Sequence, residues 1–190
     1  MKAVIFNGAR EENPVINAVE TSLTKLLTAS GWEVEPVRLR EKQIAGCLGC
    51  FGCWVKTPGI CVIDDYGREA TRKAFQSDLL VWLTPITFGG YSSELKKALD
   101  RMIPILMPYF DIYKGQIHHQ MRYDKYPKLL VIGTEPLKPE YVEVFLALTE
   151  RNALNMRPPK HATGIFRRTE DLGEVSCFVG DLLRKVEAIL

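Results

Sequence analysis

The strongest constraint on the fold is a continuous apolar run, Leu-Leu-Val-Trp-Leu, at residues 79–83. A strand with one face in water alternates apolar and polar residues, whereas a run without polar residues is typical of a parallel strand covered on both faces. A second such run, Leu-Leu-Val-Ile, occupies residues 129–132. The two runs therefore predict a parallel sheet with helices on both faces.

Three further segments are predicted to complete this sheet. Residues 2–6 form a short buried strand, residues 32–39 alternate as in a strand near an edge, and residues 162–166 form a weak fifth strand. Between these segments, apolar residues recur at helical spacing. The expected helices cover residues 14–31, 66–76, 92–102, 141–154 and 173–190, with Pro14 at a helix start and Asp65 and Ser92 as candidate caps.

Five strands separated by helices fit a doubly wound α/β sheet of order 2-1-3-4-5, the order of flavodoxin. We therefore predict a single flavodoxin-like domain over residues 1–190, with helices on both faces of the sheet. Ligands of such sheets bind beyond the carboxyl ends of the strands where the order reverses. In this sequence those ends are residues 7–13, 84–91 and 133–136.

Residues 102–126 interrupt the alternation of strands and helices, because Pro104 and Pro108 break the helical pattern. The segment is aromatic, basic and rich in turn residues, which indicates an insertion over the site or an oligomer surface. A small monomer rarely leaves so apolar a stretch exposed. We therefore expect at least a dimer, with this segment at the interface.

Charge and composition exclude several classes of function. The formal net charge is +2, and no stripe of Lys and Arg is present, so we expect no nucleic-acid partner. The most apolar stretch is cut by Pro85 and Gly89-Gly90, so we expect no membrane span. The apolar stretch at the beginning of the sequence is too short for a signal peptide. The clustered cysteines suit a reducing compartment. These features predict a cytoplasmic protein.

The loop after the central strand combines Pro85, an aromatic residue and two glycines. A flat isoalloxazine ring needs backbone N–H groups near its polar edge and an apolar face against its plane. Glycines let the backbone come close, and Phe88 or Tyr91 offers a stacking face. A glycine-rich turn with a buried Phe is the alternative. The predicted flavin contacts here are Pro85, Ile86, Thr87, Phe88 and Gly89.

The loop after the first strand is the candidate phosphate site, because helix N-termini bind anions. Its candidate ligands are Asn7, Gly8, Arg10 and Asn13, together with Gly133 and Thr134 after the fourth strand. Glu11 and Glu12 oppose this role, because carboxylates repel a phosphate. Capping of the helix is the alternative role of Asn13.

Four cysteines crowd into one loop, as Cys47-Leu-Gly-Cys50-Phe-Gly-Cys53 followed by Cys61. Two C-x₂-C steps and a fourth cysteine supply the four thiolates of a 4Fe–4S cluster. Zinc fits less well, since Cys50 would be shared between two knuckles. Free thiols beside a flavin, with redox chemistry of their own, and a disulfide remain open. Cys177, on the last helix, is expected in the core.

Two blocks of residues resemble those of one family. Residues 47–54, followed by 57–61 and Asp64-Asp65, resemble the C-x-G-C-x-x-C…G-x-C…D-D block of flavodoxin-fold NAD(P)H-dependent FMN reductases, which include the iron–sulfur flavoproteins. Residues 84–90, with Leu95-Lys96 and Asp100-Arg101, look like a second block of the same family. The resemblance covers residues 1 to about 135.

The resemblance implies FMN at the three loop ends, hydride from NADH or NADPH, and a homodimer or homotetramer. Iron–sulfur members would also hold a 4Fe–4S cluster on cysteines that match Cys47, Cys50, Cys53 and Cys61. The chain departs from the pattern where the family reads Gly-Ser-Pro-Arg in its phosphate loop, because residues 8–14 carry no hydroxyl group. This departure predicts a low affinity for FMN or a different hold on its phosphate.

The sequence therefore predicts an FMN-dependent oxidoreductase that takes hydride from NAD(P)H and passes electrons to a small-molecule or protein acceptor. The flavin performs hydride transfer, so no acid–base pair is needed. One alternative is an electron carrier that combines flavin and cluster. Another is a non-enzymatic redox or metal sensor that uses the cysteine loop, with a degenerate flavin site.

Overall fold

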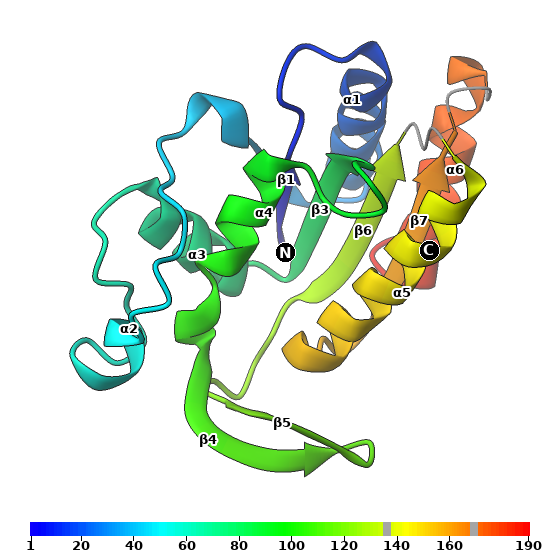
Figure 1. Cartoon of the computed structure of the whole chain (residues 1–190). Coiled ribbons are helices and arrows are strands. Elements are labelled where there is room, and N and C mark those ends of the chain that lie inside the picture. Colours follow the sequence, from blue (N-terminus) through cyan, green and yellow to red (C-terminus); the bar gives the residue numbers. More distant parts are fainter. Residues whose placement is uncertain (135–137, 168–170) are drawn as a thin grey trace.

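The core of the computed structural model is a parallel sheet of five strands in the order β2-β1-β3-β6-β7 (Figure 1). Because β4 and β5 form a separate hairpin, this order is the predicted 2-1-3-4-5 arrangement. The structure describes residues 1–134, 138–167 and 171–190. The strands of the sheet are β1 (Lys2–Asn7), β2 (Glu33–Arg38), β3 (Leu79–Pro85), β6 (Lys128–Thr134) and β7 (His161–Phe166).

Two helical layers cover the sheet, as the apolar run of β3 predicts. Alternate residues of this strand point to opposite faces, so Leu79, Val81 and Leu83 pack in one core with α1 and α6. Leu80 and Trp82 pack in the second core, with the other three long helices. The helices are α1 (Pro14–Ala29), α3 (Tyr66–Gln76), α4 (Ser93–Asp100), α5 (Pro139–Met156) and α6 (Val175–Lys185), and a short α2 (Gly52–Val55) lies in the cysteine loop.

Local capping chemistry fixes where three of these helices begin. The side chain of Asn13 accepts a hydrogen bond from the Ile16 N–H group, with Pro14 as the first helical residue. Asp65 caps α3 through the Gly67 N–H group, and Ser92 caps α4. These are the caps that the sequence predicts. In the described part of the chain no helix is long and apolar enough to cross a membrane.

The interrupting segment forms an antiparallel hairpin of β4 (Leu106–Tyr113) and β5 (Gln116–Met121). Lys114 and Gly115 both have positive φ, as a two-residue hairpin turn requires. The hairpin joins α4, which runs back from the strand tips, to the start of β6. It therefore projects from the opposite end of the domain (Figure 1). It does not cover the strand tips of its own chain, contrary to one of our two interpretations. Its role as an oligomer surface remains a prediction.

The end of α5 holds the hairpin in place. Arg157 caps this helix in a left-handed conformation, with φ of 47°. Its guanidinium binds the carboxylate of Asp111 and lies 4.4 Å from the centre of the Tyr113 ring. His118 Nδ1 lies 2.9 Å from Asn155 Oδ1. One face of the hairpin is thus packed against the domain.

Candidate functional site

Gly8 joins the loop after β1 to the tip of β3. Its N–H donates to the Leu83 carbonyl at 2.8 Å, and its carbonyl accepts from the Ser92 hydroxyl at 2.5 Å. A Cβ at this position would lie 2.8 Å from both Leu95 Cβ and Ser92 Oγ, which is closer than real Cβ atoms approach. Only glycine therefore allows these two loops to meet.

The loop after β3 is joined in the same way to the end of β6. The Ile86 N–H donates to the Thr134 carbonyl at 3.0 Å. A Cβ on Gly133 would lie 2.7 Å from Ile86 Cδ1, so the absence of a side chain at Gly133 leaves room for the buried side chain of Ile86. The structure thus brings together the three predicted loop ends. Residues 135 and 136 of the third loop lie outside the described residues.

A tight turn presents Phe88 at the strand tips. The backbones of Thr87 and Gly90 bond to each other in both directions, at 3.0 and 2.9 Å. Phe88 and Gly89 have φ of 50° and 76°, the signature of a type I′ turn. A left-handed phenylalanine is strained, and such strain clusters at functional sites. The Phe88 side chain is 83% exposed, so the alternative of a buried Phe is wrong.

Tyr91 has a different position from the one that a flavin-stacking residue needs. It is buried, contacts the rings of Trp82 and Phe145, and accepts a hydrogen bond from Asn152 at 2.9 Å. Burial raises the pKa of Tyr91 to about 12. The interpretation of Tyr91 as a stacking face is therefore wrong, because its ring belongs to the core, and Phe88 is left in that role.

Two of the predicted phosphate ligands shape the loop with their side chains. Asn7 is fully buried, donates to the Glu20 carboxylate at 2.6 Å and accepts from the Ala9 N–H at 2.9 Å. Asn13 accepts from the Ile16 N–H at 3.0 Å, which is the capping role left open above. Arg10 is exposed on the loop. Binding of phosphate by these residues stays a prediction.

Sequence reasoning missed one polar group near these loops and did not foresee the surroundings of another. Arg40 lies in the 3₁₀ turn Leu39–Glu41 after β2 and forms an ion pair with Glu12. It was missed because the strand-order rule points only to the ends of β1, β3 and β6. The Thr134 hydroxyl was named as a candidate, but its isolation was not foreseen. It is fully buried and has no hydrogen-bond partner among the described residues.

The four clustered thiols lie near one another in the loop between β2 and α3. All five cysteines are free; Cys53 is buried, Cys61 is half-buried, and Cys47 and Cys50 are exposed. Burial raises the pKa of Cys53, and nearby Cys61 and, less strongly, Cys47 and Cys50 raise it further. Cys177 is exposed on the last helix, contrary to the expectation of a core position.

The thiols do not form a ready metal site. Within residues 1–134, 138–167 and 171–190, no group of three or more His, Cys, Asp or Glu side chains is placed to hold a metal ion. The donor set fits a four-thiolate cluster in number and type, but its positions do not. A metal would therefore require the loop to rearrange.

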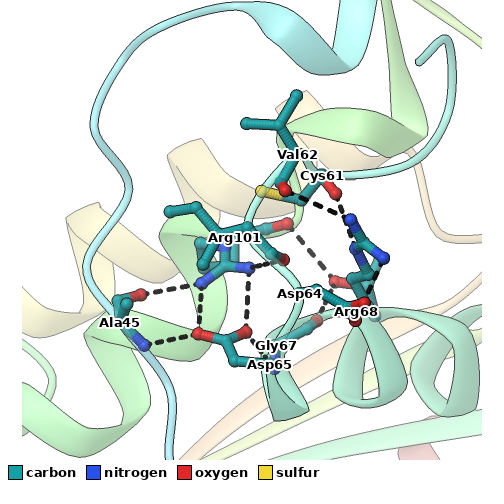
Figure 2. Close-up of polar contacts among 10 residues, drawn as sticks. Ala45, Cys61, Val62, Asp64, Asp65, Gly67, Arg68 and Arg101 are labelled. Atoms are coloured by element: carbon teal, nitrogen blue, oxygen red, sulfur yellow. Dashed lines mark hydrogen bonds and ion pairs between the residues drawn. The ribbon is translucent and has the colours of Figure 1, made fainter.

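A buried Arg–Asp pair closes the base of this cysteine loop (Figure 2). The Arg101 guanidinium donates to the carbonyls of Ala45 at 3.0 Å and Ile63 at 2.9 Å, on the two sides of the loop. The Asp65 carboxylate accepts from both guanidinium nitrogens at 2.9 Å and from the N–H groups of Ala45 and Gly67 at 2.8 Å. One guanidinium therefore ties both ends of the loop together.

The Cys61 thiol lies next to Arg101 of this pair. Burial alone would lower the pKa of Arg101, but hydrogen bonds and charge from Asp65 and the Cys61 thiol raise it instead. Arg68 donates to the carbonyls of Cys61 at 2.7 Å and Val62 at 3.1 Å. The thiol thus lies beside the buried Arg101, and its backbone is held by the partly exposed Arg68.

The family profile described as NADPH-dependent FMN reductase matches residues 1–116, more than half of the chain. The chain belongs to this family. An iron-sulfur flavoprotein of Archaeoglobus fulgidus is 33% identical over 104 residues, which are 55% of this FMN reductase homologue and 46% of that protein. An FMN-dependent NADPH-azoreductase of Staphylococcus aureus is 32% identical over 102 residues, 54% of the chain and 52% of that enzyme.

This FMN reductase homologue thus spans about half the length of the curated relatives that it matches. Among solved structures, an FMN-dependent NADH-azoreductase from Bacillus anthracis, in complex with FMN, superposes with a TM-score of 0.69. The superposition covers 98% of both chains at 13% identity. This likeness shows the fold alone.

Replacement of Asp65 tests the closure of the cysteine loop. Burial would raise the pKa of Asp65, but hydrogen bonds from Arg101 and the N–H groups of Ala45 and Gly67 lower it overall. Its carboxylate therefore stabilises the fold above the unfolded-state pKa of about 4, and this contribution is lost as the pH falls. We expect Asp65→Asn to cost about 3 kcal/mol at neutral pH, and less in acid.

Urea unfolding at a series of pH values measures this effect. The control is Asp64→Asn, which removes a neighbouring carboxylate whose side chain is 83% exposed and paired only at the surface with Arg68. This change should cost less than about 1 kcal/mol. Equal losses in the two variants, or a loss for Asp65→Asn that does not vary with pH, would contradict the structural role of the buried pair.

Proposed function

We propose that the chain binds FMN at the tips of β1, β3 and β6 and uses it to oxidise NAD(P)H, passing electrons to a small-molecule or protein acceptor. The observation that carries the proposal is the meeting of the three loops, one of which presents an exposed, left-handed Phe88. The fold class binds ligands at this edge of the sheet. Membership of the family supports the same cofactor.

The residues at these tips fit a flavin. The exposed Phe88 ring offers a face on which a flavin ring could stack. The turn that includes Gly89 would bring backbone N–H groups close to the same ring. FMN supplies the hydride-accepting chemistry when bound. The role of the chain is therefore to hold and orient the ring, without an acid–base pair.

Names given to relatives favour a nicotinamide cofactor as the donor, NADPH in one and NADH in another, and a small molecule as the acceptor. The relative from Staphylococcus aureus is named an FMN-dependent NADPH-azoreductase, and the fold neighbour from Bacillus anthracis is an azoreductase in complex with FMN.

Five free cysteines suit a reducing compartment, so we place this activity in the cytoplasm.

Replacement of Phe88 tests the flavin site. We expect FMN added to the wild-type chain to lose fluorescence on binding, and NADPH to bleach its absorbance without air. Phe88→Ala should raise the Kd for FMN about fivefold, because the stacking face is lost. Tyr109→Ala, which removes a ring that is 63% exposed on the hairpin, is the control and should leave the Kd unchanged.

A wild-type chain that neither quenches millimolar FMN nor gains thermal stability from it would contradict the flavin proposal. The sensor alternative would then lead. A chain that binds FMN but is not reduced by NADPH or NADH would instead favour the electron carrier.

We further propose that the cysteine loop closes on a 4Fe–4S cluster when iron and sulfide are supplied. The nearness of the other thiols to Cys53 and the buried Arg101 beside Cys61 support this role. A relative at 33% identity carries the name iron-sulfur flavoprotein. No step of the NAD(P)H reaction depends on this cluster.

Anaerobic reconstitution tests the cluster. We expect about four irons per chain and a brown colour, as a four-thiolate cluster implies. Cys61→Ser should lose most of the iron, and Cys177→Ser, which removes the thiol outside the loop, should lose none. Failure to take up iron while the thiols remain titratable would favour free thiols instead.

We also propose that the outer face of the hairpin packs against a second copy of the chain. Phe110, Ile112 and Ile117 on this face are 62 to 78% exposed. His119 extends the face, because its ring lies 4.4 Å from Phe110 and 4.9 Å from Trp54 of the cysteine loop. Apart from the histidine these side chains carry no titratable group, which suits contact between identical surfaces.

Light scattering at micromolar concentration tests the assembly. We expect a dimer or tetramer for the wild type, and a monomer for the double variant Ile112→Lys/Ile117→Lys, because it places charges on the apolar face. Leu172→Lys adds a charge at an exposed position outside the hairpin and should leave the mass unchanged. A monomeric wild type would contradict the proposal.

A further inference from the structure

A cavity of about 320 Å³ lies between α4 and α5, which pack on the same face of the sheet (Figure 1). It reaches from Trp82 in β3 to the 3₁₀ turn Ile103–Ile105 and to Leu106, where the hairpin begins. Most of its lining is apolar, including Leu99, Met102, Leu148 and Met156. Cavities that bind small molecules have volumes of about 300–1,000 Å³ and apolar walls with a few polar groups. This cavity therefore has the size and the lining for a molecule of one or two rings.

Trp82 brings to this cavity a hydrogen-bond donor that has no acceptor. The residue is 1% exposed, and its Nε1 atom has no partner among the residues that the structure describes. The other two tryptophans are satisfied. Trp32 Nε1 donates to the carbonyl of Ala188 at 2.8 Å, and Trp54 Nε1 donates to that of Leu106 at 3.0 Å. Because an indole N–H can only donate and buried donors nearly always have a partner, the Trp82 group indicates a ligand with an acceptor atom.

Tyr91 supplies a second donor to the same cavity. It is 8% exposed, and its ring lies 5.8 Å from that of Trp82 in an edge-to-face arrangement. Its oxygen accepts from Asn152 Nδ2 at 2.9 Å, and the hydroxyl makes no other hydrogen bond in the described part of the chain. Burial raises the pKa of Tyr91 to about 12, so at neutral pH the phenol keeps its proton and can donate it. An indole N–H and a phenol O–H thus lie close together, and both suit an oxygen acceptor.

The charges around the cavity favour a neutral ligand. Of the described residues that line it, Lys96 and Asp100 are charged, and they pair with each other at 2.6 Å along α4. Neither charge is therefore left to bind an ion. A carboxylate or an ammonium group that entered the cavity would lose its hydration without gaining a charged partner. The lining suits an uncharged molecule that carries an oxygen acceptor.

We propose that this cavity binds a small, uncharged aromatic carbonyl compound, whose oxygen accepts hydrogen bonds from Trp82 Nε1 and the Tyr91 hydroxyl. The aromatic ring lies among the apolar side chains of α4 and α5, where the flexible Met102 and Met156 adapt to its shape. The site is separate from the proposed flavin site, because Phe88 is not among the described residues that line the cavity. It therefore does not depend on the binding of FMN.

Two ligands of the same shape separate the hydrogen bonds from simple apolar binding. Acetophenone carries a carbonyl oxygen, and α-methylstyrene has a CH₂ group in its place. Titration of each into the ¹⁵N-labelled chain, without added flavin, gives both Kd values and reports on the indole N–H groups. We expect acetophenone to bind about fivefold more tightly, because its oxygen satisfies buried donors. It should also shift the assigned indole signal of Trp82 and leave that of Trp32, which already donates to Ala188, in place.

Trp82→Phe and Tyr91→Phe each remove one donor and keep an aromatic ring. Each should raise the Kd of acetophenone about fivefold and change that of α-methylstyrene by less than about twofold. Trp32→Phe is the matched control, because it makes the same replacement in the core on the opposite face of the sheet, and it should change neither Kd. Tyr91→Phe decides the matter if Trp82→Phe does not fold.

Four results would overturn the proposal. They are equal affinity for the two ligands, binding of acetophenone without a shift of the Trp82 signal, an equal loss of affinity in Trp32→Phe, and no binding of either ligand at millimolar concentration. Because the titrations contain no flavin, none of these results bears on the proposed oxidation of NAD(P)H, and the two proposals fail separately.

Discussion

The buried pair of Arg101 and Asp65 is the interaction that fixes the position of the cysteine loop relative to the strand tips. A buried charge is costly unless it is paired and hydrogen-bonded, and here the guanidinium bonds to one carboxylate and two carbonyls. Arg101 caps the end of α4, whereas Ser92 caps its beginning and bonds to Gly8. One short helix thus connects the loop at the strand tips to the loop that carries the cysteines.

This connection fixes the position of the two loops relative to each other. A helix of eight residues is about 12 Å long, and its hydrogen bonds allow little change of length. The glycine contacts at Gly8 and Gly133 fix the strand-tip end, and the Arg101 bonds fix the cysteine end. A rearrangement of the thiols is therefore expected to take place inside the loop, between Ala45 and Ile63, without moving the strand tips.

The features that the sequence predicted correctly depend on local rules or on topology. The apolar run of β3 implies burial on both faces, and the caps at Asn13, Asp65 and Ser92 need only their next few residues. Features that depend on tertiary geometry were missed. The strained turn decides that Phe88 is exposed while Tyr91 is buried, and no pattern places Arg40 against Glu12. Pairing of the hairpin was hidden by its mixed composition.

The base of the hairpin has a consequence for how this domain can vary. The N–H of Arg122 donates to the carbonyl of Ile105 at 3.1 Å, and its guanidinium donates to the carbonyls of Pro104 and Leu106. The chain therefore leaves the domain and returns to it at nearly the same point. Because such a closed excursion adds little loop-closure entropy, the domain core can tolerate a different hairpin here, provided that the new segment replaces the contacts with the end of α5. The hairpin is thus a position, remote from the strand tips, at which a different recognition element could replace the present one while the rest of the domain stays the same.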